Sequence, residues 1–195
     1  MAARRFSQAI SEGDGISVLV DVHDAESARA AEGQGAEALV VDSLVDAVRA
    51  ATELPILCRA SNSLASTAGA GADACLLVVA DHREEDDRLE RLYAEALELG
   101  LDCVVEVRSD EELELALERL DPEIFQLSRA RDDGEDAVDR ALDLLPDVPA
   151  GKLAMAEVAV STRDEVVELE RAGFDAVIVG ARDVAELVGH APPQV

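Results

Sequence analysis

The sequence predicts a single-domain (β/α)8 barrel, the TIM-barrel fold class, of unusually short length. Short apolar segments rich in Val, Ile and Leu alternate with amphipathic helical segments along the whole chain, and there are eight such units. Strict alternation implies a parallel sheet, and eight units is the number that closes a barrel. The chain has 195 residues, of which 49% are hydrophobic, so it can bury one sizeable core.

The periodicity places each element in turn. Continuous apolar runs predict buried strands, at residues 16–22, 39–42, 55–59, 75–79, 101–107, 124–128, 152–157 and 177–180. Helical spacing predicts helices between them, over residues 25–32, 61–70, 86–99, 110–120, 135–145, 162–172 and 183–188, with a further helix after residue 43. We expect residues 1–15 to form an N-terminal arm, 16–190 the barrel and 191–195 a tail.

Helix starts are marked by capping residues. Ser109 with Glu112 forms a capping box, and we expect Ser43 and Thr162 to cap the helices that follow them. The stretch 101–120 therefore contains a complete strand, turn and helix.

Four helix-to-strand junctions share one pattern. Gly35, Gly71, Gly100 and Gly173 are each followed two residues later by an acidic residue and then by an apolar strand. Glycine suits the left-handed position that ends a helix. A doubly wound open sheet is the alternative fold, but it usually has fewer strands and a glycine-rich first turn, which residues 22–25 lack.

The charge is strongly negative. The net charge is −26, with a pI near 4.2, and Lys152 is the only lysine. This charge disfavours nucleic acid and anionic membranes as partners. Acidic residues spread over helix faces resemble the surfaces of halophilic proteins, where salt screens their repulsion; a high-GC genome is the alternative explanation. Without a long apolar segment or a signal peptide, we expect a cytoplasmic protein with no membrane contact.

No cofactor or metal is expected. The three cysteines lie far apart in strand-like runs, which favours buried free thiols over a disulfide or metal cluster. A metal site built from Asp21, His23 and glutamates is conceivable, but His82 and His190 lack ligand-like spacing. The sequence contains no phosphate-binding or dinucleotide fingerprint.

Candidate functional residues follow from the fold, because barrel enzymes carry their chemistry at the carboxyl ends of the strands. The polar residues at these ends are Asp21, His23, Asp42, Arg59, Asp81, Glu106, Ser128, Glu157 and Arg182, beside Gly180. Strand alternation puts Asp21 and His23 on one face, which we take to be the lumen. These groups suit acid–base chemistry. Alternatively, Arg59 neutralises Glu106 and Glu157 in a polar plug that binds no substrate.

Several of these segments resemble one known family. The segments LPILCR at 54–59, GADACLL at 71–77, LDCVVEV at 101–107 and FDAVIVG at 174–180 are similar to those of indole-3-glycerol-phosphate synthase. The resemblance runs from about residue 16 to 188. It implies a (β/α)8 barrel of tryptophan biosynthesis, a lyase that closes and decarboxylates an anilino-deoxyribulose phosphate.

The resemblance also implies site residues. Glu106 and Glu157 match the family's glutamates, Asp21 and His23 stand at its strand-one Glu and Lys, and Arg59 stands at its strand-three Lys. Ser128 lies near its strand-six Asn. Its phosphate site falls on Ala159, Gly180 and Ala181, and Arg182 with the following helix start adds an anion-binding feature. The N-terminal extension that covers the family's active site is mostly absent.

Three hypotheses follow. The first is a lyase of this family with a rearranged site that uses His23 as acid and Glu106 or Glu157 as base, because Arg59 has too high a pKa to donate a proton. The second is a non-catalytic minimal barrel with ligand binding or no retained chemistry. The third is a phosphate-binding isomerase or aldolase. Replacement of the familiar lysines predicts that synthase activity is not retained in its usual form. The expected partner is a small phosphorylated substrate; the oligomeric state stays open.

Overall fold

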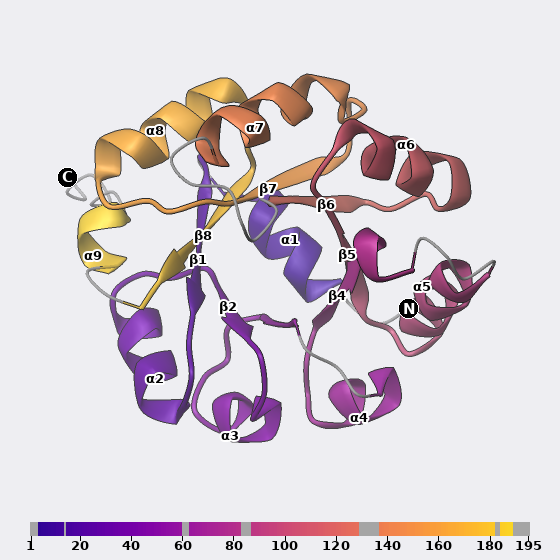
Figure 1. Cartoon of the computed structure of the whole chain (residues 1–195). Coiled ribbons are helices and arrows are strands. Elements are labelled where there is room, and N and C mark those ends of the chain that lie inside the picture. The colour runs from indigo at the N-terminus through magenta and orange to yellow at the C-terminus, as the bar shows by residue number, and fades with distance from the viewer. Residues whose placement is uncertain are drawn as a thin grey trace.

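The computed structural model describes residues 4–13, 15–59, 63–82, 87–128, 137–181 and 184–188. Eight parallel strands follow one another in sequence order around a closed barrel, and the helices surround it (Figure 1). The predicted TIM-barrel fold is therefore confirmed, and the open-sheet alternative is excluded. Among the described residues, no helix is long and apolar enough to cross a membrane.

The structure fixes the element bounds. The strands are β1 Ser17–Asp21, β2 Ala38–Val41, β3 Ile56–Cys58, β4 Ala74–Val78, β5 Asp102–Val107, β6 Ile124–Ser128, β7 Leu153–Glu157 and β8 Ala176–Gly180. The helices are α1 Arg5–Ser11, α2 Ala25–Gly33, α3 Val45–Arg49, α4 Leu64–Gly69, α5 Arg88–Glu98, α6 Asp110–Arg119, α7 Ala137–Leu144, α8 Arg163–Ala172 and α9 Val184–Leu187, with short 3₁₀ turns η1 Val79–His82 and η2 Leu145–Asp147.

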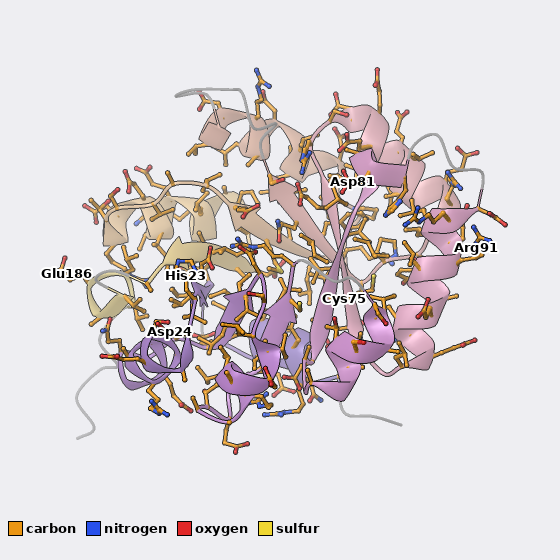
Figure 2. All side chains as sticks on the ribbon, turned by 60° about the horizontal axis from the view of Figure 1, so that its bottom comes forward. His23, Asp24, Cys75, Asp81, Arg91 and Glu186 are labelled. Carbon is orange, nitrogen blue, oxygen red and sulfur yellow. The ribbon has the colours of Figure 1, made fainter. Side chains whose placement is uncertain are left out.

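The core has two parts because strand side chains alternate between the two faces of the sheet. One part fills the barrel interior and includes Leu19, Leu57, Val104 and Met155. The other lies between the strands and the helices. The three cysteines are all buried there and form no disulfide, as predicted, and they are register neighbours on β3, β4 and β5. Figure 2 labels the middle one, Cys75.

The N-terminal helix α1 closes the amino-terminal end of the barrel. Phe6 and Ile10 are buried among the interior side chains, and the Ser7 amide donates to the buried Asp102 carboxylate at 2.9 Å. Arg5 donates to the Glu53 carbonyl oxygen at 2.5 Å, before β3. Figure 1 shows α1 across the middle of the ring of strands. The N-terminal segment thus contributes to the core. The division into arm, barrel and tail stays a prediction, and residues 191–195 lie outside the described part of the chain.

The glycine junctions are confirmed. Gly35, Gly71, Gly100 and Gly173 have φ between 77° and 112°, the left-handed region that glycine adopts without strain. The acidic side chains of two of these junctions bond to neighbouring strands. Asp73 accepts from the Ile56 amide at 3.0 Å, and Asp175 accepts from the Ala154 amide at 2.8 Å.

The capping predictions hold for two helices and fail for one. Ser109 caps α6 by accepting from the Glu112 amide, whereas the Glu112 side chain, predicted to complete a capping box, accepts from the Arg108 amide. Thr162 forms a capping box with Glu165 at the start of α8. Ser43 does not cap α3. Its N-cap residue is Leu44, which has φ 59° and no side-chain cap bond. The helix therefore begins one residue later than predicted. The left-handed backbone conformation of Leu44 cannot be predicted from its residue type.

Candidate functional site

A cavity of about 1330 Å³ opens at the carboxyl ends of the strands. It lies at the end opposite to α1, where barrel enzymes place their sites. Five carboxylates, three guanidinium groups and His82 line it. The wall therefore carries more negative than positive charge.

Arg59, directly after β3, is surrounded by carboxylates. Its guanidinium lies 3.0 Å from Asp21 on β1 and 3.5 Å from Glu157 on β7. A longer contact of 3.7 Å reaches Asp42, after β2. These contacts neutralise the charge of Arg59. They also bring the carboxyl ends of β1, β2, β3 and β7 together around one guanidinium group.

Glu106 forms a second network on β5 and β6. Its side chain is only 6% exposed, and one carboxylate oxygen, Oε1, accepts from Arg108 Nε at 2.6 Å and from Ser128 Oγ at 2.6 Å. The polar plug considered from the sequence had Arg59 neutralising both Glu106 and Glu157. Arg59 does contact Glu157, but the cation that pairs with Glu106 is Arg108. Arg108 lies two residues after Glu106, so alternation directs it toward the same side of the sheet.

Glu157 belongs to the Arg59 network and also contacts β6. Its Oε2 accepts from Gln126 Nε2 at 2.9 Å. Burial raises the pKa of the Glu157 carboxyl above its ordinary value, while the Arg59 guanidinium acts in the opposite direction. The Glu106 and Asp21 carboxylates add to the increase. The Glu157 carboxyl thus keeps its proton to a higher pH than an ordinary glutamate does.

Three buried polar atoms beside Glu157 have no hydrogen-bond partner among the described residues. They are Asp21 Oδ1, Gln126 Oε1 and Arg59 Nε. Buried polar groups are normally paired, with protein, water or a ligand. The floor of the site therefore has capacity for further hydrogen bonds.

His23 does not join these residues. The strand β1 ends at Asp21, and the chain leaves the sheet before His23, whose side chain is exposed and does not line the cavity. Figure 2 shows His23 beside Asp24, well separated from Asp81 on the cavity wall. Asp21 faces the interior as expected. The assumption that His23 shares that face is wrong, because His23 is the second residue after β1 and alternation no longer sets its direction there.

The predicted phosphate residues lie at the ends of β7 and β8. Ala159 lines the cavity, and Gly180 and Ala181 are exposed. Gly180 is the register partner of Asp21, so a carboxylate stands next to it. Arg182 lies outside the described residues.

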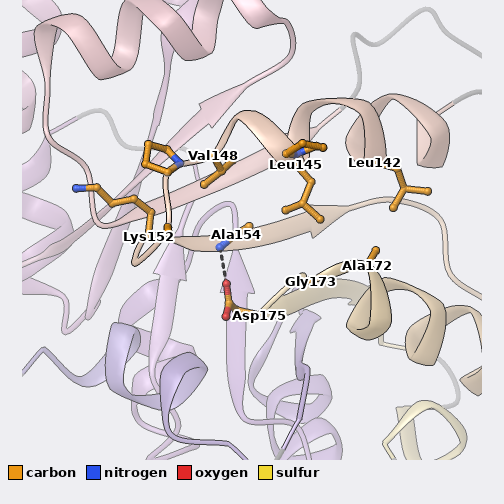
Figure 3. A pocket seen from close by; sticks show the side chains of 11 residues that line it. Leu142, Leu145, Val148, Lys152, Ala154, Ala172, Gly173 and Asp175 are labelled. Carbon is orange, nitrogen blue, oxygen red and sulfur yellow. Dashed lines mark hydrogen bonds between the residues drawn. The ribbon is translucent and has the colours of Figure 1, made fainter.

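Lys152, the only lysine, lies at the other end of the barrel. It precedes β7, forms an ion pair with Asp121 and lines a second cavity of about 450 Å³ between α7, η2 and α8 (Figure 3). Its ammonium group therefore cannot serve the mouth.

The sequence reasoning missed several residues of the site, among them Arg108, Gln126, His82, Arg88 and Glu95. Arg108 and Gln126 have the same alternation as Glu106 and Ser128, and this signal could have identified both. His82, on η1 after β4, lines the cavity, with Nδ1 buried and without a partner among the described residues. Its place depends on a turn that the sequence pattern does not predict. Within the described ranges, no three His, Cys, Asp or Glu side chains are grouped to hold a metal ion.

The curated proteins that are similar to this chain include several indole-3-glycerol phosphate synthases. A relative from Variovorax paradoxus (strain S110), named indole-3-glycerol phosphate synthase, is 33% identical over 185 residues, which cover 90% of this chain and 64% of the relative. A synthase from Nocardioides sp. is 38% identical over 187 residues, covering 87% and 69%. One from Shouchella clausii is 35% identical over 115 residues, or 44% of its length. The matched segments thus cover between 44% and 69% of the length of these relatives.

Solved structures agree on the fold. The N-acetylmannosamine-6-phosphate 2-epimerase from Clostridium perfringens superposes with a TM-score of 0.70 at 14% identity, covering 87% of each chain. A putative phosphonomutase from Burkholderia cenocepacia gives 0.61 at 16% identity, covering 85% of this chain and 87% of that one. At such identities these likenesses show the barrel architecture alone.

The family model of indole-3-glycerol phosphate synthase matches residues 41–185, which include β3 to β8 and most of the mouth residues described above. With the relatives and the confirmed barrel, this match establishes that the chain belongs to the indole-3-glycerol phosphate synthase family.

Proposed function

We propose that this barrel is a divergent family member that does not carry out the synthase reaction and keeps its mouth as a ligand-binding site. The proposal rests on the position of the only lysine. Lys152 precedes β7, whereas the residues at the family's lysine positions are His23 and Arg59. The ring closure implied by the family needs a group that donates a proton to the substrate.

Neither replacement supplies that proton well. Arg59 is paired with carboxylates, and a guanidinium group is not a useful proton donor. Imidazole groups in general can donate a proton near neutral pH, but the side chain of His23 is exposed and does not line the cavity. The wall of the mouth is also short of positive charge for a phosphorylated substrate.

The test is a turnover assay with the anilino-deoxyribulose phosphate, which follows the fluorescence of the indole product in molar KCl. We expect no indole above the rate without protein. Turnover that disappears in Glu106→Gln would overturn the proposal, since the glutamate would then be acting on substrate.

A second candidate is an active lyase in which Glu157 replaces the ammonium as the acid. The raised pKa of Glu157 favours it, because a carboxyl that holds its proton closer to neutral pH is a better donor. In this case turnover would fall as the pH rises through the pKa of Glu157, and Glu157→Gln would abolish it. No separate observation on the described residues favours the isomerase or aldolase hypothesis.

A further inference from the structure

One guanidinium group at the mouth, that of Arg59, is shared by three carboxylates. Its Nη2 lies 3.0 Å from Asp21 and 3.5 Å from Glu157, and its Nη1 lies 3.7 Å from Asp42. One positive charge therefore faces three negative charges when all three carboxyl groups are ionised. An anion that approaches Arg59 meets a net negative charge, which repels it.

The contact between Arg59 and Asp42 is the one that a ligand can replace. At 3.7 Å it is longer than a hydrogen bond, and the Asp42 side chain is 62% exposed, so the ion pair is weak. Arg59 and Asp42 both line the cavity, whereas Asp21 does not. The Nη1 side of the guanidinium group is therefore the part that an oxyanion in the cavity reaches.

Glu157 is the carboxylate of this group whose charge changes most easily. Its side chain is 34% exposed and lines the cavity, so protons reach it from solvent. Burial raises the pKa of its carboxyl above the ordinary value. A proton on Glu157 leaves Arg59 facing two negative charges instead of three, without any movement of the backbone.

The surroundings of Glu157 make the effect of this proton local. Four charged side chains act on its carboxyl from neighbouring strands, namely Arg59, Asp21, Glu106 and Arg108. The last two form an ion pair with each other, so their charges largely cancel. On β6, the neighbours Gln126 and Ser128 carry no charge, and β8 contains no titratable side chain. Protonation of Glu157 therefore changes chiefly the charge that Arg59 faces.

We propose that Glu157 is a proton switch for anion binding at the mouth. When it is ionised it keeps small oxyanions away from Arg59, and when it is protonated an oxyanion binds Nη1 of Arg59 in place of Asp42. This position, at the ends of β2 and β3, differs from the phosphate residues that the family resemblance implies at the ends of β7 and β8. The inference rests on the proposed function, in which the mouth binds a ligand without synthase turnover.

The test is a calorimetric titration of the full chain with potassium sulfate in molar KCl, at several pH values between about pH 8 and about pH 5. Sulfate keeps its charge over this range, and an ordinary glutamate titrates below it. We expect the affinity for sulfate to rise about tenfold as the pH falls, equivalent to a coupling of about 1.4 kcal/mol between proton and anion. Because linkage is reciprocal, sulfate should also raise the pKa of Glu157, which carbon NMR of its carboxyl group measures.

Two variants assign the effect to this ion-pair group. Glu157→Gln lacks the charge at every pH, so it should bind sulfate with the higher affinity and without pH dependence. Asp42→Asn removes the competing carboxylate, so it should bind sulfate more tightly than the wild type and keep the pH dependence.

Two further variants are matched controls. Asp147→Asn removes one charge at an exposed position outside the cavity lining, and its sulfate binding should equal that of the wild type. Imidazole groups in general titrate in the same pH range, and His82 lines the cavity, so His82→Gln should keep the pH dependence. Thermal unfolding at each pH verifies that every variant is folded.

A sulfate affinity that does not change with pH, or a pH dependence that persists in Glu157→Gln, would overturn the inference. Absence of saturable sulfate binding at the acidic end, or loss of the pH dependence in His82→Gln, would overturn it as well. The outcome is separable from that of the turnover assay. Indole formation would overturn the proposed function, whereas a failed titration with no indole formed would overturn the proton switch alone.

Discussion

At the scale of single residues, the mouth of this barrel is built from carboxylates that are paired with arginines. Glu106 is nearly inaccessible and depends on Arg108 and Ser128, while Asp21, Asp42 and Glu157 surround Arg59. A buried ion pair contributes little net stability, but removing one partner is costly. These pairs therefore hold the shape of the site more than they stabilise the fold.

The Glu106–Arg108 pair allows a direct measurement. We expect Arg108→Met to lower the free energy of unfolding by about 3 kcal/mol, because it leaves the Glu106 charge buried without its cation. The double variant Arg108→Met/Glu106→Gln should recover part of this loss, since no buried charge remains. Chemical denaturation of the wild type, both single variants and the double variant gives the coupling energy. Additive effects would show that the pair is not formed.

At the scale of elements, α1 is the part that distinguishes the amino-terminal end. Phe6 and Ile10 fill the interior, and the Ser7 amide donates to Asp102. Burial raises the pKa of the Asp102 carboxyl above its ordinary value, and the bond from Ser7 only partly offsets this effect. Keeping Asp102 as a buried carboxylate at neutral pH therefore lowers the stability of the folded protein.

The sign of the pH effect follows from linkage. Because the pKa of Asp102 is higher in the folded than in the unfolded protein, the folded state binds more protons between the two values, and stability falls as the pH rises through this interval. We expect Asp102→Asn, which keeps an acceptor for Ser7, to be more stable than wild type at neutral pH. The difference should vanish in acid below the ordinary pKa of aspartate. Asp147→Asn, at an exposed position, is the matched control; equal behaviour of the two variants would contradict this account.

The elements also show what the sequence could predict. The glycines at 35, 71, 100 and 173 and the caps at Ser109 and Thr162 are local signals, and the structure confirms them. The failures depend on tertiary geometry. The turn at Leu44 and the end of β1 before His23 depend on how the chain leaves the sheet, and the docking of α1 depends on space inside the closed barrel.

The site was predictable to a similar extent. Alternation correctly directs Arg59, Glu106, Ser128 and Glu157 to the wall of one mouth, and Asp21 contacts Arg59 there. The same two-residue spacing would have included Arg108 after Glu106 and Gln126 before Ser128. Which carboxylate pairs with which arginine depends on side-chain packing across the barrel. The sequence contains no signal for that choice.

At the scale of the whole molecule, the net charge of −26 is the dominant property. Like charges on a compact surface repel one another, and salt screens this repulsion over a Debye length of about 10 Å at 0.1 M and about 3 Å at 1 M. We propose that the acidity is an adaptation to a saline environment. If a high-GC genome explains the composition, the stability of the protein need not depend on salt.

The salt dependence separates these explanations. We expect the thermal unfolding midpoint to rise steeply between dilute buffer and molar KCl, because screening stabilises the compact state. A parallel titration with a neutral osmolyte controls for solvent effects on apolar burial. A midpoint that is independent of KCl would contradict the saline interpretation.

We propose that this family member has lost the synthase chemistry, because its only lysine lies away from the mouth and Arg59 and Arg108 at the mouth are held by carboxylates. The decisive measurement is the fluorescence assay for indole formation from the anilino-deoxyribulose phosphate in molar KCl. We expect a rate equal to that without protein, both for the wild type and for Glu106→Gln. A wild-type rate above this background that Glu106→Gln abolishes would contradict it.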